Sequence, residues 1–338
     1  MGFLRVAVLD APAAALAWLG RQGTRAIAAL VFLGIAMPPL DALLKPFVTE
    51  AIFVLLCLAF LRVDPAALRG YLGRPGLVLA ATAWTTLAIP AVFGVGCLAI
   101  GLEVRSPDLF LALMLQAVAS PMMASPALAA LLGLDATLVL VTLVAGTALT
   151  PFTAPLFARA VIGPALTLAP LTLGLRLFAI LAGSALVAVL LRRIVGLAAI
   201  VRHTDTIAGI NILVVFIFVA AVMEHVAARF AAAPLVMCEL ALLAFGVFFA
   251  VLTVTALVFA RAGRERALVL GLMAAQRNMG LMVAATGGAL PDLAWLYFAL
   301  SQFPIYLSPQ MLKPLAQRLT ARSPHTHAGT DQPPTRLV

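Results

Sequence analysis

Three consecutive polar residues, Gln276, Arg277 and Asn278, interrupt an otherwise apolar stretch late in the chain. Arg277 lies eleven residues after Arg266, where the apolar run begins, which is about 16 Å along a helix and near the middle of a bilayer core of about 30 Å. A guanidinium at that depth costs roughly 2.5–3.5 kcal/mol, so it usually faces protein or a watered cavity. Because arginine stays charged and presents a fork of N–H donors, the sequence predicts a site for a carboxylate or sulfonate here.

The backbone around these residues is expected to be non-helical. Three adjacent polar side chains cannot share one helical face, and Gly280 follows them. A second apolar stretch carries Ser120-Pro121 and Ser125-Pro126 at its midpoint, where each proline lacks an amide proton and clashes with the preceding turn. We therefore predict two discontinuous helices, broken at residues 120–126 and 276–280, that cross near the bilayer midplane.

Composition predicts an all-α membrane protein. Of 338 residues, 64% are hydrophobic and 10% are charged, with a mean hydropathy of +1.13, whereas a soluble domain has about 25% charged residues. The apolar segments are too long for the strands of an outer-membrane barrel. Three cysteines, Cys57, Cys97 and Cys238, lie inside apolar segments without metal-like spacing.

Ten membrane spans are expected between an N-terminal interfacial helix within residues 1–24 and a disordered cytoplasmic tail at 319–338. The transporter-like domain is thus residues 25–318. The spans are 25–43, 46–62, 75–101, 107–132, 136–158, 166–191, 207–226, 234–260, 266–288 and 292–313.

Basic residues favour one orientation of these spans. Of the 22 Lys and Arg residues, sixteen fall on the side of the N-terminus and five on the other, with Arg277 inside the membrane. This bias places both termini in the cytoplasm of a multi-pass protein of the cell's inner (plasma) membrane. Two units of five spans necessarily have opposite orientations, so we expect an inverted repeat with the fourth and ninth spans broken.

The order of several motifs resembles the bile acid:sodium symporter superfamily between about residues 25 and 313. Four stretches account for the resemblance. They are the second span with its exit, Leu44-Lys45-Pro46 through Phe60 to Arg69; the Ser120–Pro126 break; Pro151 and Pro155 after Thr147; and Asn278 with Gly280-Leu281. The auxin efflux carriers, which share broken helices, are a second resemblance. What the resemblance implies is a core domain of spans 3–5 and 8–10 beside a panel domain of spans 1, 2, 6 and 7.

The sodium ligands of that family are mostly missing. The resemblance places Thr85 where the family has a glutamine, Met273 where it has a glutamate and Arg277 where it has a second glutamine. Sodium needs several oxygen ligands with negative charge nearby, and a fixed cation repels it. We therefore expect sodium-independent transport, with Arg277 acting as an anion-binding or cation-surrogate residue.

The predicted substrate-binding residues are Arg277, Asn278, Gln276, Ser120, Ser125, Thr147 and Thr85. Glu239, near the start of the eighth span, has three open interpretations. In the first, it couples transport to protons. In the second, it pairs permanently with Arg277 and locks spans 8 and 9 together, and in the third it is a helix-end residue that reaches water.

The favoured function is a secondary transporter that moves a small organic anion by alternating access. An enzyme is not expected, because His-Glu-x-x-His, Gly-x-Ser-x-Gly and Asp-rich magnesium motifs do not occur. No cofactor or metal is expected. A nucleic-acid partner is not expected either, because the basic residues cluster at segment ends. The expected partners are the lipid bilayer and an anionic small molecule, with homodimer formation left open. A sodium- or proton-coupled symporter of the same fold is the alternative, followed by a membrane sensor or channel.

Overall fold

The computed structural model describes residues 2–22, 43–63, 75–223 and 226–320. This part of the chain consists of helices and their connections, with one isolated bridge between Pro121 and Arg277 and no strand. The all-α prediction is confirmed. Residues 25–42 of the expected first span and 321–338 of the predicted disordered tail lie outside the described residues, whereas residues 319 and 320 of that tail are helical.

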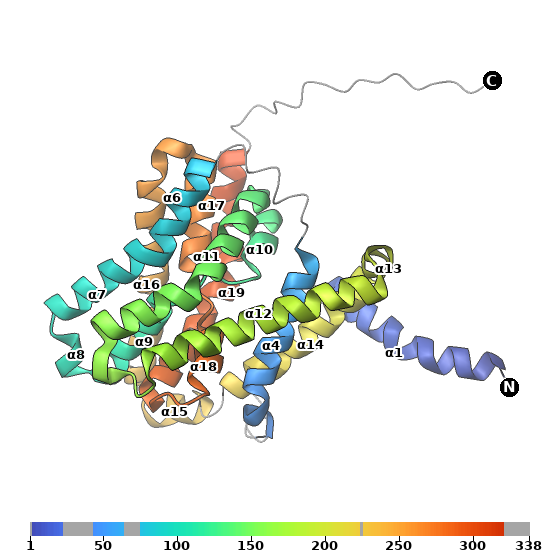
Figure 1. The fold of residues 1–338 in the computed structure, drawn as a ribbon, viewed down its shortest axis with the longest axis horizontal. Coiled ribbons are helices and arrows are strands. Elements are labelled where there is room, and N and C mark those ends of the chain that lie inside the picture. The colour runs from blue at the N-terminus through green and yellow to red at the C-terminus, as the bar shows by residue number, and fades with distance from the viewer. Residues whose placement is uncertain (1, 23–42, 64–74, 224–225, 321–338) are drawn as a thin grey trace.

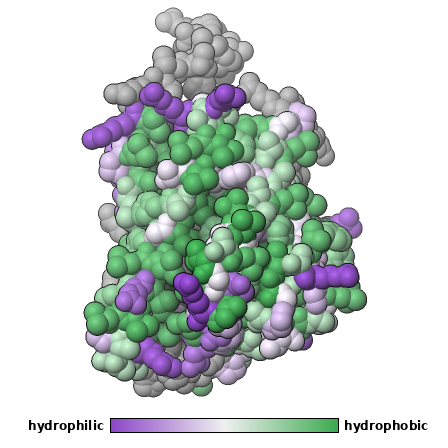
Figure 2. Space-filling model, turned by 90° about the vertical axis from the view of Figure 1, so that its left-hand side faces the viewer, coloured by the Kyte–Doolittle hydropathy of each residue, from purple (hydrophilic) through white to green (hydrophobic). Residues whose placement is uncertain are grey.

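Five helical stretches are long and apolar enough to cross a membrane, so the chain is a multi-pass membrane protein. They are Pro75–Ala99, Ala136–Ala165, Pro170–Val195, Pro234–Val258 and Thr204–Ala232, of which residues 224–225 lie outside the described part. Figure 2 shows a broad hydrophobic band between hydrophilic residues above and below it on one face. Leu242 and Val95 are exposed by 72% and 70%, as expected for side chains that face lipid.

Helices occupy the nine remaining expected spans within the described residues, although several are divided. The undivided helices are α4 (Val48–Arg62), α11 (Ala136–Phe157), α12 (Pro170–Val195), α14 (Thr204–Val222), α16 (Pro234–Val258) and α19 (Asp292–Thr320). The divided ones are α6 (Pro75–Ala83), η3 (Trp84–Ala88) and α7 (Ile89–Ala99); α9 (Pro107–Val118) and α10 (Ser125–Leu131); and α17 (Arg264–Ala275) and α18 (Met279–Thr286).

Short helices join these spans. They are η1 (Lys45–Phe47), α8 (Leu102–Arg105), η4 (Ala158–Ile162), η5 (Gly163–Ala165), α13 (Leu197–Arg202), α15 (Val226–Ala232) and η6 (Ala260–Ala262).

The helices pack in two groups. One contains α4, α12 and α14, and the other contains α6, α7, α9, α10, α11, α16, α17 and α19 (Figure 1). Helix α12 extends between them, contacting α4 in the first group and α11 in the second, and α18 contacts both α4 and α12. Arg192 of α12 donates to the carbonyl oxygens of Leu61 and Val63, which fixes the end of α4.

The predicted N-terminal helix is present as α1 (Gly2–Gln22). It packs on α14 through two glycines (Figure 1). A Cβ at Gly20 would lie 2.0 Å from the carbonyl oxygen of Asp205, and one at Gly209 would lie 1.9 Å from that of Leu16. Arg21 also pairs with Asp205 at 3.6 Å. Close backbone contact of this kind is possible only without side chains.

Gly271 sets the distance between α16 and α17, which gives a stability test. A Cβ at Gly271 would lie 2.5 Å from the carbonyl oxygen of Leu252, whereas a Cβ at Gly246 would meet nothing within 4 Å. We expect Gly271→Ala to destabilise the purified protein by about 1–3 kcal/mol through overpacking. Gly246→Ala should leave the melting temperature unchanged or slightly higher. Equal melting temperatures for both variants would contradict this packing.

Candidate functional site

The two predicted helix breaks are confirmed, and they lie against each other. Helix α9 ends at Val118 and α10 begins at Ser125, while α17 ends at Ala275 and α18 begins at Met279. The Met122 amide donates to the Gln276 carbonyl at 2.7 Å, and the Asn278 amide donates to the Ser120 carbonyl at 2.8 Å. The crossing therefore satisfies backbone groups that an unbroken helix would have bonded internally.

Asn278 has a structural task at the crossing. Its side-chain oxygen accepts a hydrogen bond from the Leu281 amide at 3.1 Å, which caps the start of α18. Phe218 of α14 lies beside Gly280, where a Cβ would be 3.4 Å from the Phe218 ring, an ordinary van der Waals distance. The sequence predicted that Asn278 binds substrate, but its carbonyl oxygen is already bonded to the helix.

Gln276 is fully buried and attaches the crossing to α19. Its Nε2 donates to Ser308 Oγ at 3.1 Å, and Ser308 Oγ donates to the Ile305 carbonyl at 2.7 Å. The Gln276 Oε1 atom has no hydrogen-bond partner among the described residues. One end of this side chain is therefore fixed, and the other end is an unused acceptor.

Arg277 is 3% exposed, and carbonyl oxygens hold it in place. Its Nη1 donates to Ala119 O at 2.8 Å and to Thr85 O at 3.0 Å. The Nε and Nη2 atoms have no partner within the described part of the chain, and no described acid forms an ion pair with this guanidinium. A buried cation thus has neutral acceptors on one side and free donors on the other.

Both acceptor carbonyls are free because their helices are interrupted. Ala119 has an extended backbone, with ψ of 147°, and follows the last residue of α9. Thr85 lies in the π-helix η3, where the Ile89 amide bonds to the Trp84 carbonyl. The next donor in that pattern would be residue 90, which is proline and has no amide proton. Pro90 therefore leaves the Thr85 carbonyl to Arg277.

The free donors of Arg277 have the geometry of an anion-binding fork. Nε–H and one Nη2–H lie on the same edge of the planar guanidinium and point in parallel, which matches the two oxygens of a carboxylate. Since Nη1 is committed to the two carbonyls, the orientation of this edge is fixed. An oxyanion is the ligand that would satisfy both donors and neutralise the charge.

Ser120, Ser125 and Thr147 are each no more than 2% exposed, and their hydroxyl oxygens have no partner among the described residues. The Ser120 carbonyl accepts the hydrogen bond from the Asn278 amide at the crossing, and the Ser125 amide donates to the Met122 carbonyl at 2.9 Å, which closes a turn. Thr147 is next to Gly146, where a Cβ would lie 3.6 Å from Pro121 Cδ and 3.9 Å from Thr85 Oγ1. The buried hydroxyls of Thr82 and Thr142 have no partner among the described residues either, so this property is shared by residues outside the predicted set.

Neither the Thr85 hydroxyl nor the Glu239 carboxylate bonds to Arg277. Thr85 contributes its carbonyl to Arg277, while its hydroxyl donates to the Ala81 and Thr82 carbonyls at 2.9 and 3.0 Å. Glu239 is exposed on α16 and forms no ion pair with Arg277. The interpretation in which these two residues are permanently paired is therefore wrong, whereas proton coupling by Glu239 stays a prediction.

Three contributors were missed at the level of sequence: Ser308, Pro90 and the Ala119 carbonyl. Pro90 stands in the middle of an apolar span, which was a usable signal for a freed carbonyl. Nothing in the chain order connects Ser308 with Gln276. A further buried pair, Tyr297 donating to Gln116 Oε1, links α19 to α9 in the same way.

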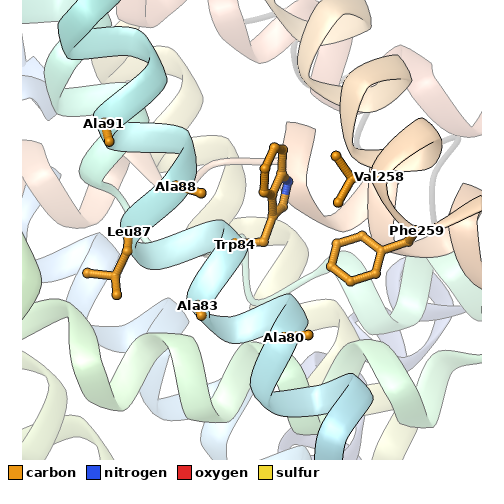
Figure 3. A pocket seen from close by; sticks show the side chains of 8 residues that line it. All are labelled: Ala80, Ala83, Trp84, Leu87, Ala88, Ala91, Val258 and Phe259. Atoms are coloured by element: carbon orange, nitrogen blue, oxygen red, sulfur yellow. The ribbon is translucent and has the colours of Figure 1, made fainter.

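An apolar groove of about 650 Å³ lies between η3 and the end of α16 (Figure 3). Trp84 points across it toward Val258 and Phe259, and Leu87 is 44% exposed at its side. None of the residues that line the groove is one of the predicted site residues. Its alanine and leucine lining is suited to lipid rather than to an anion.

No group of three or more His, Cys, Asp or Glu side chains comes together in the described ranges. No protein-family model matches the chain, and no curated protein matches it either. The resemblance to the bile acid:sodium symporter superfamily therefore stays a prediction, and the site is interpreted from its own geometry.

The attachment of Gln276 to α19 can be tested with two buried serines. Ser308→Ala leaves Gln276 Nε2 without its partner, and we expect a destabilisation of about 1–3 kcal/mol. Ser184→Ala is the matched control, because Ser184 is equally buried and donates only to the Leu181 carbonyl of its own helix, at 3.0 Å. Thermal unfolding in detergent measures both. A loss in Ser184→Ala as large as that in Ser308→Ala would contradict the role of the Gln276 contact.

Proposed function

We propose that this protein is a secondary transporter of a small organic anion, with Arg277 as the residue that binds the anion. The observation that supports this most strongly is the unpartnered Nε/Nη2 edge of a buried guanidinium. A structural arginine in a membrane interior normally has a carboxylate or a full set of acceptors. Here two carbonyls fix Nη1 and leave the edge that best matches an oxyanion.

The crossed broken helices support transport over a purely structural role. Transporter sites commonly form where two discontinuous helices meet near the bilayer midplane. In our proposal the helices form two inverted five-helix repeats, both termini are cytoplasmic, and the chain is a distant relative of the bile acid:sodium symporters in an inner (plasma) membrane. The group with the crossing is the core domain, and α4, α12 and α14 belong to the panel domain.

Several contacts link α18 and α19 to the group of α4, α12 and α14. Phe218 of α14 approaches Gly280 of α18, as described above. Arg176 Nη1 of α12 donates to the Ala285 carbonyl of α18 at 3.3 Å, and Trp295 Nε1 of α19 donates to the Val222 carbonyl of α14 at 3.2 Å. Helix α12 also packs closely on α11, where a Cβ at Gly174 would lie 2.9 Å from the Pro151 carbonyl oxygen. In our proposal these contacts change when the two groups move past each other in alternating access.

Anion binding is tested by thermal stabilisation of the purified protein, since a ligand that binds the folded state raises its melting temperature. We expect stabilisation by some of acetate, benzoate, ethanesulfonate and benzenesulfonate, and none by acetamide. Arg277→Gln should abolish the shift while the protein stays folded. Arg277→Lys keeps the charge but loses the parallel fork, and we expect affinity to fall about 10- to 100-fold.

The matched control for these variants is Glu239→Gln, which removes an exposed carboxylate that does not contact Arg277. It should give the shift of the unmutated protein. An anion shift that survives Arg277→Gln would show that the anion binds elsewhere, and the proposed function would then have lost its binding residue.

Sodium independence follows from the charge of the site. A cation at bonding distance from Arg277 would be repelled by several kcal/mol at an effective dielectric of about 20, and no described acid pairs with Arg277 to compensate. In proteoliposomes, we expect anion uptake to be the same in sodium and in potassium buffers. A strict requirement for a sodium gradient would contradict this expectation and favour the symporter alternative.

A further inference from the structure

We infer that the substrate carries a single negative charge and that transport is an obligate one-for-one exchange of such monoanions. This inference rests on the proposed function and goes beyond it, because it specifies the charge class of the substrate and the coupling. The charge balance inside the protein, the fixed position of Arg277 and its place beside the contact between the two helix groups support it.

Among the buried residues of the described chain, Arg277 is the one charged residue. The other buried polar residues are neutral threonines, serines and glutamines. A monoanion on Arg277 therefore gives a neutral complex, whereas a dianion would leave one uncompensated negative charge among apolar neighbours. Because an unpaired charge is costly in a low-dielectric interior, the site favours a monoanion over a dianion of similar size.

The empty site keeps the charge of the arginine. The two carbonyls and the C-terminal end of α9 stabilise the guanidinium only in part, since they are dipoles rather than an anion. No described acid can replace the substrate as a counter-ion, because none pairs with Arg277. The empty carrier is therefore positively charged inside, and the loaded carrier is neutral.

The helix contact beside the site is apolar. Phe218 faces Gly280, and Leu281 and Met282, which follow in α18, are fully buried. If the core moves past the panel here, a neutral complex passes this region more readily than an unpaired guanidinium does. The return of the empty carrier is then the slow step of net transport. An anion that binds on the far side makes the carrier neutral again, so the carrier returns faster with this anion bound.

The size of this effect can be bounded. An unpaired charged side chain at the bilayer centre costs roughly 2.5–3.5 kcal/mol. Since each 1.36 kcal/mol changes a rate tenfold, exchange should be faster than net transport by about 100-fold. Exchange of one monoanion for another moves no net charge. The exchange rate should therefore be independent of the membrane potential.

The experiment uses the full chain in proteoliposomes and the monoanion among acetate, benzoate, ethanesulfonate and benzenesulfonate that stabilises it most. Uptake of the radiolabelled anion is measured into vesicles that contain the same unlabelled anion and into vesicles that contain only potassium sulfate, whose anion carries two charges. We expect rapid uptake in the first case and about 100-fold slower uptake in the second. A potassium gradient with valinomycin should leave the exchange rate unchanged. Internal succinate, as the dianion, should not support exchange.

Arg277→Lys is the informative variant, because it keeps the buried charge. It should need a higher anion concentration for half-maximal exchange and keep the same strict need for an internal monoanion. Melting temperatures of both proteins confirm that the variant is folded.

Two sets of results overturn this inference without affecting the proposed function. The first is net uptake as fast as exchange, or an exchange rate that changes with the potential. The second is a preference for succinate over the four monoanions in both stabilisation and flux. Absence of any anion-dependent stabilisation, in contrast, would overturn the proposed function itself and this inference with it.

Discussion

The structure around the crossing depends on how one buried guanidinium is held. A carboxylate partner would satisfy Arg277 completely, fix it in place and neutralise it. Two backbone carbonyls, from Thr85 and Ala119, fix it equally well in position but leave its charge and two of its donors available. This combination of a fixed side chain and unused binding capacity separates a binding arginine from a structural one.

The backbone carbonyls that bind Arg277 are free because their helices are interrupted. Interrupted helices in a membrane need other hydrogen-bond partners for the backbone groups that lose their helical ones. The two breaks supply them to each other through the Met122–Gln276 and Ser120–Asn278 backbone hydrogen bonds. Side chains provide the rest, since Asn278 caps α18 and Gln276 reaches Ser308 on α19. Each polar residue of the Gln276–Asn278 run therefore has a different task, although the three are adjacent in the chain.

Proline frees one of the carbonyls that hold Arg277, because Pro90 leaves the Thr85 carbonyl without a helical donor. Gly146 of α11 lies beside Pro121 and Thr85, and Gly280 of α18 lies beside Phe218 of α14. These close contacts put the candidate site between interrupted helices and next to the second helix group, which is where a movement of one group against the other would change access to it.

The sequence by itself determined the all-α membrane class, the positions of the described helices and both helix breaks. These follow from local properties: apolar length fixes the spans, and Pro121, Pro126 and Gly280 disfavour continuous helix wherever they are placed. It also identified Arg277 as the residue of interest, because a charge at the bilayer centre is costly in any fold.

Only the tertiary structure decided what each polar side chain contacts. The sequence left Glu239 open as the partner of Arg277, yet the structure exposes Glu239 and gives Arg277 two carbonyl oxygens from distant helices. It also showed that the Asn278 side chain caps α18, while its predicted role in substrate binding stays a prediction. Backbone carbonyls are present at every residue, so no pattern of side chains shows which of them are free. That depends on where helices end and on which segments, far apart in the chain, pack against those ends.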